Sequence, residues 1–137
     1  MQRVKNAKVG ASEIGKGLLV LVGIKKEDKE KQAINLAEKL SKLRVMADRQ
    51  QKMNLTVSDV NASILVVSQF TLHGGTSGGN RPSFINVEEP SKARELYELF
   101  IEKLKEKGGI NVKTGTFGNY MEIEVVLDGP VTILYLD

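Results

Sequence analysis

The sequence contains no cysteine and a single histidine, His73, among its 137 residues. Without cysteine the chain cannot form a disulfide, a thiolate zinc site or a cysteine nucleophile. An imidazole-based metal site or a Ser-His-Asp triad would depend on His73 alone. No group of acidic residues or histidines lies at ligand spacing beside it. We therefore assign His73 no catalytic role and expect neither a metal nor a cofactor.

Aromatic residues are also scarce, at 5% of the chain, and tryptophan is absent. This scarcity argues against a base-stacking platform of the kind that binds single-stranded nucleic acids. No apolar run approaches the roughly 20 residues that a membrane-spanning helix needs. The first ten residues, MQRVKNAKVG, are polar and lack the apolar region of a signal peptide. These absences, together with the lack of cysteine, predict a cytoplasmic protein.

The remaining composition is that of a soluble globular protein rather than a disordered or fibrous one. Hydrophobic residues make up 41% of the chain and charged residues 27%. The length suits one domain covering residues 1–137. A net charge of +3 permits an anionic partner such as RNA, although many enzymes are equally basic.

Two segments have helical periodicity, and apolar strands separate them. Residues 27–43 and 90–109 predict amphipathic helices, the second with Pro90 at its first position. Their expected buried stripes are Ala33, Ile34, Ala37, Leu40 and Leu43 in the first helix, and Ala93, Leu96, Tyr97, Phe100 and Leu104 in the second. The runs at 17–24 and 63–70 predict buried strands.

The end of the chain has a β pattern again. Residues 111–115, 119–127 and 131–136 predict strands, and Asp-Gly at 128–129 predicts a hairpin between the last two. We expect an α/β fold in which both helices pack on one side of a mixed sheet, curled or doubled into a small sandwich.

The stretch SQFTL, residues 68–72, overlaps the end of the second predicted strand. If the strand continued, Ser68 and Phe70 would point one way, and Gln69 and Thr71 the other. In one interpretation, the Ser68 and Thr71 hydroxyls only form hydrogen bonds with main-chain groups where the strand leaves the core. Alternatively, Gln69 and Thr71 lie at the mouth of a pocket. The sequence leaves both interpretations open.

The segment from His73 to Pro82, HGGTSGGNRP, predicts a long glycine-rich loop. It lacks the G-K-[ST] ending of a P-loop and does not lead directly into a helix, which excludes a nucleoside-triphosphatase site of that type. Arg81 is available for an RNA phosphate. A solvent-exposed loop without a ligand explains the composition equally well.

The stretch LDGPVT near the C-terminus places Pro130 at the start of an expected strand. There the proline removes a main-chain donor. A proline in a tight turn can follow a cis peptide bond, which is usually a deliberate feature. A rigid turn would account for Gly129-Pro130 but not for the lost donor.

Together, SQFTL and a C-terminal DGPVT resemble the D-aminoacyl-tRNA deacylases, also called D-tyrosyl-tRNA deacylases. The segments QRV, GLLVLVGI, NRPSF and TGTFGNYM agree, so the resemblance covers essentially the whole chain. It implies an enzyme that hydrolyses the ester between a D-amino acid and tRNA and so proofreads translation. It also implies a homodimer with active sites at the subunit interface.

The resemblance assigns site residues to two subunits. Ser68, Gln69, Phe70 and Thr71 of one subunit form the catalytic wall. The partner lends Gly129 and Pro130, joined by a cis bond, as a chiral gate. In addition, Arg3 supports the gate, and Phe117 and Met121 line the adenosine end of the pocket.

This assignment is physically coherent. Rigid main-chain carbonyls at Gly129 and Pro130 would collide with an L side chain. Glycine has no side chain to reject, so glycyl-tRNA should also be cleaved. Main-chain donors near Phe70 and Thr71 would stabilise an oxyanion. The tRNA's terminal 2′-hydroxyl would assist the attacking water.

The chain departs from the family pattern in its shorter first hairpin, in Leu127, and in GGTSGGN, where paired lysines are usual. The last departure weakens the expected basic surface for tRNA. The sequence also leaves two alternative functions open. One is a non-catalytic tRNA-binding module, and the other is a hydrolase that uses Thr71 or Ser68 as a covalent nucleophile.

Overall fold

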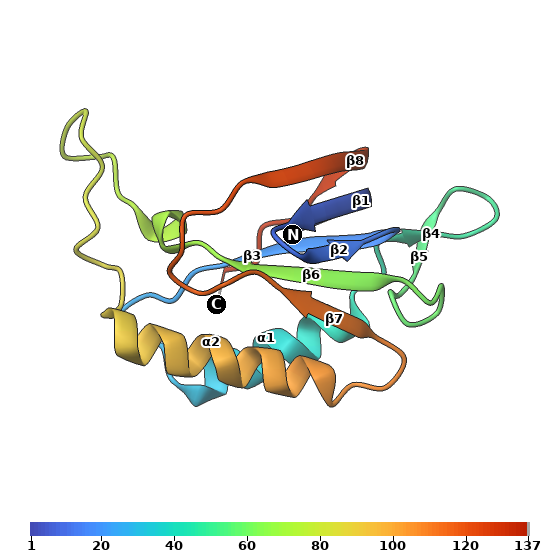
Figure 1. Ribbon diagram of the computed structural model, residues 1–137, viewed down its shortest axis with the longest axis horizontal. Coiled ribbons are helices and arrows are strands. Elements are labelled where there is room, and N and C mark those ends of the chain that lie inside the picture. Colours follow the sequence, from blue (N-terminus) through green and yellow to red (C-terminus); the bar gives the residue numbers. More distant parts are fainter. Residues whose placement is uncertain (137) are drawn as a thin grey trace.

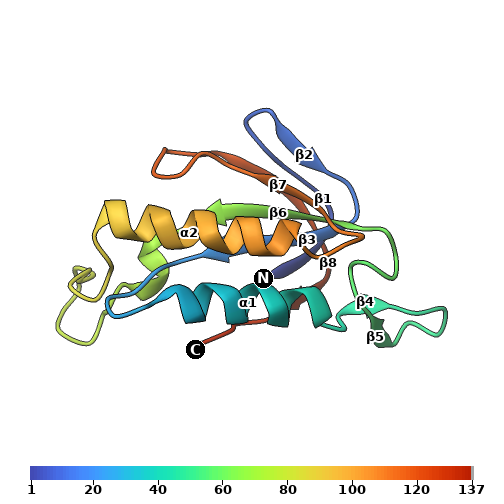
Figure 2. The ribbon, with the colours of Figure 1, turned by 90° about the horizontal axis from the view of Figure 1, so that it is seen from below.

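One mixed β-sheet carries both helices on the same face, as the sequence predicted (Figures 1 and 2). The computed structural model describes residues 1–136. The strands are β1 (Gln2–Val9), β2 (Ser12–Ile14), β3 (Gly17–Val22), β4 (Met46–Ala47), β5 (Met53–Leu55), β6 (Ser63–Ser68), β7 (Asn111–Thr114) and β8 (Ile123–Thr132), and the α-helices are α1 (Glu30–Lys42) and α2 (Pro90–Lys105). Within these residues no helix is both long and apolar enough to cross a membrane.

The sheet has the order β2-β1-β3-β6-β7, and β8 joins it by pairing with β1. Strands β3, β6 and β7 are parallel, whereas β1 runs antiparallel to β2, β3 and β8. Val22 of β3 is opposite Ser68 of β6, so these two strands end together. Ligands commonly bind at the carboxyl ends of parallel strands.

Alternate residues of β3 and β6 enter two separate cores. Val20 and Val66 face α1 and α2, whereas Leu19, Leu65 and Val67 pack against β1. This alternation follows from the period of two along a strand. The helices cover one face of β3 and β6. Because the sheet curls, β1 packs over the other face, and β8 runs beside β1 (Figure 1).

Helix α1 differs from its prediction at two apolar positions. Leu43 follows the last residue of the helix and is only partly buried. Ala33, Ala37 and Leu40 are buried, but Ile34 is 42% exposed. The prediction that Ile34 belongs to the buried stripe is therefore wrong. The buried positions are spaced by four and three residues, which places Ile34 at the solvent edge of the stripe.

Helix α2 confirms its prediction, because all five residues of the expected stripe are buried. Pro90 occupies its first turn, and the Glu89 carboxylate accepts hydrogen bonds from the main-chain N–H groups of Ser91 and Lys92. This cap satisfies two of the N–H groups that a helix start leaves without a partner.

Strand β6 is shorter than the sequence predicted. It ends at Ser68, and a 3-10 turn follows at Phe70–His73. The Gln69 N–H bonds the Val22 carbonyl at 2.8 Å, and the Gly74 N–H then closes the turn on the Thr71 carbonyl at 3.0 Å. The expected alternation of side chains along SQFTL is therefore wrong beyond Ser68.

The predicted C-terminal hairpin is also wrong, because β8 continues through Asp128-Gly129. Leu127 pairs with Val4 and Thr132 pairs with Gln2, so the strand keeps one partner on both sides of the motif. Residues 128–131 bulge out of the ladder instead of reversing it. A bulge leaves the extra residues unpaired, so Pro130 sits where no ladder donor is required.

Candidate active site

A cleft of about 840 Å³ opens at the carboxyl end of β6. Ser68, Gln69 and Phe70 contribute one wall, and Phe117 and Met121 line it from the connection between β7 and β8. The start of α2 and the segment before it complete the cleft. Five of the predicted site residues thus meet in one place.

The 3-10 turn lies directly against the end of β3. A Cβ on Gly23 would come within 2.8 Å of the Gln69 carbonyl oxygen and 3.2 Å of the Leu72 Cβ. Only glycine permits this close approach. The Gln69 amide also donates to the Thr71 hydroxyl. The side chains of Gln69 and Thr71, expected to share one side of a strand, are therefore joined across a turn.

An aromatic pair forms the outer wall of the cleft. The rings of Phe70 and Phe84 meet edge to face with centroids 5.2 Å apart. Beyond them, Gly75 and Ser83 exchange two main-chain hydrogen bonds of 2.7 and 2.8 Å, which close the base of the glycine-rich loop. Phe84 thereby ties this loop to the wall of the cleft.

A second aromatic pair lies on the inner side. Tyr97 of α2 contacts Phe117 with ring centroids 5.3 Å apart, and its hydroxyl donates to the Val66 carbonyl at 3.4 Å. Burial raises the pKa of Tyr97 to about 12, so the phenol stays protonated at neutral pH. Tyr97 therefore fixes Phe117 relative to β6 and does not act as a base.

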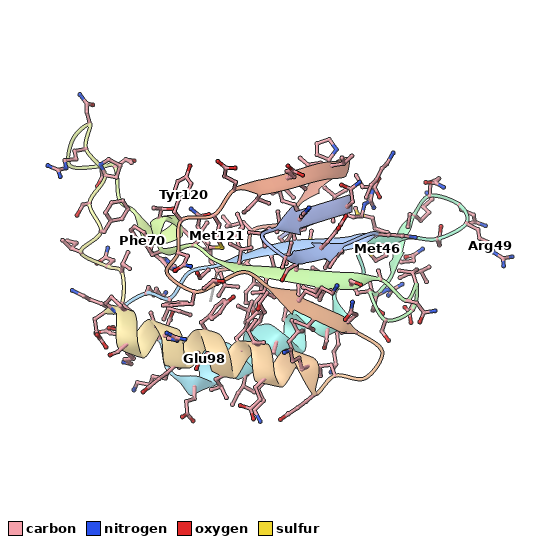
Figure 3. All side chains as sticks on the ribbon, viewed as in Figure 1. Met46, Arg49, Phe70, Glu98, Tyr120 and Met121 are labelled. Atoms are coloured by element: carbon pink, nitrogen blue, oxygen red, sulfur yellow. The ribbon has the colours of Figure 1, made fainter. Side chains whose placement is uncertain are left out.

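Met121 lies over a glycine. A Cβ on Gly115 would come within 2.6 Å of the Met121 sulfur, so the missing side chain makes room for it. Figure 3 shows Met121, Phe70 and Tyr120 at the same end of the sheet, with Arg49 at the opposite end. Met121 is thus part of the cleft although it precedes β8.

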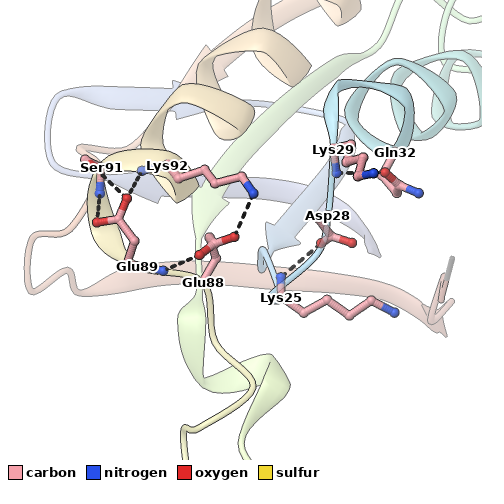
Figure 4. Close-up of polar contacts among 8 residues, drawn as sticks. All are labelled: Lys25, Asp28, Lys29, Gln32, Glu88, Glu89, Ser91 and Lys92. Carbon is pink, nitrogen blue, oxygen red and sulfur yellow. Dashed lines mark hydrogen bonds and ion pairs between the residues drawn. The ribbon is translucent and has the colours of Figure 1, made fainter.

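Glu88 and Glu89 line the cleft at the start of α2, but both are engaged (Figure 4). The Glu89 N–H and then Lys92 lower the pKa of Glu88, and bonds from Ser91 and Lys92 lower that of Glu89. Both are carboxylates at neutral pH. Because they hold the start of the helix, they are poor candidates for a general base.

Arg3 and the Gly-Pro bulge form a second, separate group. The Arg3 Nε donates to the Asp128 carbonyl at 3.2 Å and lies 3.3 Å from the Asp128 carboxylate. Its Nη1 donates to the Val45 carbonyl at 3.0 Å. The Gly129–Pro130 peptide bond is cis, as predicted, and both residues are exposed.

Gly129 has φ +125°, a backbone conformation that an L side chain strongly disfavours. Within residues 1–136, neither Gly129 nor Pro130 belongs to the lining of the cleft. The structure thus divides the predicted site residues into the cleft and the Arg3-held bulge. Thr71 adjoins the cleft through Gln69.

The sequence did not identify Tyr97, Phe84, Asn119 and Tyr120 as lining residues. Tyr97 was predicted only as part of the buried stripe of α2. Helical spacing cannot distinguish a residue of that stripe that also lines the cleft from one that does not. Phe84 lies in the segment NRPSF and Asn119 in the segment TGTFGNYM. Neither segment has a helical or strand periodicity that would distinguish a lining residue from its neighbours.

The described residues contain no group of three or more potential metal ligands from His, Cys, Asp and Glu. His73 lines a smaller crevice beside α1, not the cleft. The cleft itself offers aromatic walls, the Ser68 hydroxyl and main-chain groups at a strand end. Such a site can position an ester and stabilise charge, but it presents no Ser-His-Asp arrangement.

Residues 1–136 match the model of a protein family described as D-Tyr-tRNA(Tyr) deacylase. A D-aminoacyl-tRNA deacylase of Thermotoga petrophila is 50% identical over 139 residues, covering 98% of this chain and 93% of that protein. A Bacillus subtilis protein named as an inactive D-aminoacyl-tRNA deacylase is 48% identical over 122 residues, covering 89% and 92%.

A solved structure described as a c-Myc DNA unwinding element binding protein superposes with a TM-score of 0.91. It is 38% identical in sequence, and the match covers 99% of this chain and 96% of that one. The likeness extends over the sheet, both helices and the connections that form the cleft. It confirms the curled mixed α/β architecture.

Proposed function

The chain belongs to the D-Tyr-tRNA(Tyr) deacylase family, and we propose that it hydrolyses D-aminoacyl-tRNA in a site completed by a second copy of itself. The products are free tRNA and the D-amino acid. The reaction removes wrongly charged tRNA after synthesis, as an editing step in the cytoplasm.

One observation carries the proposal of a shared site. The residues of the cleft and the Gly129-Pro130 bulge occupy separate places in one chain, yet the bulge is exposed and held by Arg3. A rigid, exposed projection and an open cleft on the same molecule suit exchange between two copies related by a twofold axis. The bulge of each subunit would then enter the cleft of the other.

Strand β8 supports the same arrangement. It is ten residues long, and in the described part of the chain it pairs with β1 alone. Val125, Val126 and Leu127 are 39%, 48% and 41% exposed beside the bulge. An exposed apolar edge strand invites association. We assign this edge to the homodimer interface.

The bulge provides a physical basis for discrimination between enantiomers. The main-chain carbonyls of Gly129 and Pro130 would occupy the space that an L side chain needs. Arg3 restrains Asp128, the residue before Gly129. The two carbonyls are therefore held in place and do not move aside easily. A D side chain points away from it, and glycine presents no side chain. Glycyl-tRNA is therefore a second substrate.

The chemistry needs little from the protein, because an aminoacyl ester is already activated. Water attacks the ester carbonyl with help from the neighbouring 2′-hydroxyl of the tRNA. Main-chain N–H groups at Phe70 and Thr71 stabilise the developing oxyanion. Phe117 and Met121 hold the terminal adenosine, and Ser68 and Gln69 position the ester.

The relative named as inactive favours one alternative function, a tRNA-binding module without catalysis. Both functions require binding of the charged 3′ end, and only one of them releases the amino acid. Catalysis therefore has to be measured, with binding as a parallel assay.

The test uses the purified protein with tRNA charged with D-tyrosine, L-tyrosine or glycine. The proposal predicts hydrolysis of the D-tyrosyl and glycyl esters and survival of the L-tyrosyl ester. Binding without release of any amino acid would support the non-catalytic alternative. Equal hydrolysis of both tyrosyl enantiomers would eliminate the chiral gate.

A further inference from the structure

A second cleft of about 680 Å³ adjoins the first. The two share Asn119, Tyr120 and Met121, so the connection between β7 and β8 forms the ridge between them. The far wall of the second cleft comes from the turn between β1 and β2. The two clefts therefore lie on either side of this ridge.

Tyr120 stands on this ridge with 91% of its surface exposed. The turn beneath it is ordered by a hydrogen bond of 3.2 Å from the Asn119 N–H to the Thr116 carbonyl. Gly118 has φ +77°, which lets the chain turn at this point. Tyr120 thus presents an unusually open aromatic face above Met121 (Figure 3).

We propose that the second cleft binds the nucleoside that precedes the terminal adenosine of tRNA, with Tyr120 stacking on its base. This inference rests on the proposed function, which places the terminal adenosine against Phe117 and Met121. Because Met121 borders both clefts, a strand that leaves the adenosine there meets Tyr120 and the second cleft next.

The polar groups of the second cleft suit a base and a ribose. Ser12, Thr114, Thr116 and Asn119 offer neutral hydroxyl and amide groups along its wall. Such groups match the edges of a base and the hydroxyls of a sugar, whereas an aromatic ring binds the face of any base.

The charges of this cleft do not suit a phosphate. Lys8 contributes one positive charge, and Glu122 and Glu124 contribute two negative charges. In addition, Lys8 lies opposite Glu13 of β2 and Glu124 of β8 in the strand register, so two carboxylates are close to its charge. The phosphate of the bound strand therefore faces solvent, and the contribution of Tyr120 is predicted to be insensitive to salt.

The experiment compares the hydrolysis of two small substrates, D-tyrosyl-adenosine and the D-tyrosyl ester of the trinucleotide CCA. The wild-type protein should have the higher kcat/KM for the trinucleotide. In Tyr120→Ala this advantage should fall by about 5- to 150-fold, the range expected for loss of one stacked base. Tyr120→Phe retains the ring and should retain the advantage, and raising the salt concentration should change neither ratio.

The proposal is overturned if the wild-type protein gains nothing from the trinucleotide, or if Tyr120→Ala reduces both substrates equally. Failure of the proposed function gives a different result, namely no hydrolysis of either ester. In that case calorimetric binding of the uncharged trinucleotide decides the question. Tyr120→Ala should weaken this binding by a similar factor, and unchanged affinity would refute the stacking role.

Discussion

The Arg3 side chain contacts both oxygen-bearing groups of Asp128, the main-chain carbonyl at 3.2 Å and the carboxylate at 3.3 Å. It also donates to the Val45 carbonyl at the base of the β4–β5 hairpin. One guanidinium therefore links β1, the Gly-Pro bulge and this hairpin. A planar fork with several donors suits such a position, and lysine has no equivalent geometry.

Replacing Arg3 by lysine should lower kcat/KM strongly and the melting temperature only moderately. The variant loses at least one main-chain hydrogen bond made by a largely buried charge, which costs about 1–3 kcal/mol. Enzyme kinetics and thermal unfolding measure the two effects. Asp128→Asn keeps the carbonyl acceptor and should be milder, with a loss of about 1 kcal/mol or less. If Asp128→Asn proves the more damaging variant, the bulge is held by the ion pair alone.

Gly23→Ala should displace the 3-10 turn that carries Phe70 and Thr71. Its new Cβ would lie 2.8 Å from the Gln69 carbonyl oxygen, a contact that requires the main chain to move. Overpacking of this kind costs about 1–3 kcal/mol, and a shift of about 1 Å near reacting groups can reduce the rate by about 100-fold. Steady-state kinetics at a temperature where the variant stays folded measure the effect.

Gly15→Ala is the matched control for that substitution. A Cβ at Gly15 meets nothing within 4 Å. It should leave both the activity and the melting temperature close to wild type. Equal behaviour of the two variants would show that the close approach at Gly23 does not position the turn.

Thr71→Ala distinguishes RNA-assisted hydrolysis from covalent catalysis. The Thr71 hydroxyl accepts a hydrogen bond from the Gln69 amide, which is not a base. We expect kcat to fall by no more than about tenfold, since loss of a nucleophile in a hydrolase costs on the order of 10⁶-fold. Single-turnover kinetics measure the step directly. Complete loss of turnover, or a trapped acyl-enzyme in the wild-type protein, would instead identify Thr71 as the nucleophile.

Glu38 gives the stability of the chain a predictable dependence on pH. Lys107 and then Lys42 lower the pKa of its carboxyl group from 4.5 to about 2. Because the folded-state pKa is depressed, the stabilisation is complete above pH 4.5 and disappears as the pH falls towards 2. The gap in melting temperature between wild type and Glu38→Gln should therefore be largest near neutral pH.

A double-mutant cycle with Lys107→Met separates the ion pair from other effects of the Glu38 substitution. The two substitutions should be non-additive at neutral pH, and their coupling should shrink as the pH falls towards 2, where Glu38 becomes about half protonated. A coupling that stays constant with pH would show that the contact between α1 and the end of α2 is not electrostatic.

The sequence predicted the elements whose signals are local. The apolar runs of β3 and β6, the stripe of α2 and the position of Pro90 were all recognisable from periodicity and capping rules. The curled sheet with both helices on one face followed from their order.

Features that depend on tertiary pairing were not predictable in this way. The Asp-Gly pair at 128–129 favours a hairpin locally, but pairing of β8 with β1 on both sides of it overrides this preference. The turn at Phe70–His73 depends on the absence of a side chain at Gly23, which is distant in sequence. Ile34 is exposed because packing against α2 and the sheet selects a narrower stripe than its spacing suggests.

The candidate site was predictable only through its resemblance to a known family. SQFTL and DGPVT lie about sixty residues apart, and within one chain their residues form two separate groups. No spacing rule connects them. The proposed connection is the second subunit, which single-chain patterns cannot reveal.

Cross-linking between two chains tests this shared site most directly, and the absence of cysteine makes it specific. One chain carries Leu72→Cys beside Thr71, and an isotopically labelled chain carries Val131→Cys beside an intact Gly129-Pro130. After mixing and treatment with a short bismaleimide, mass spectrometry should find peptides joined between labelled and unlabelled chains. Arg49→Cys, at the opposite end of the molecule in Figure 3, replaces Val131→Cys as the control and should give no such product. If the Val131→Cys chain behaves like this control, the Gly-Pro bulge does not enter the partner's cleft and the site is not shared between two subunits.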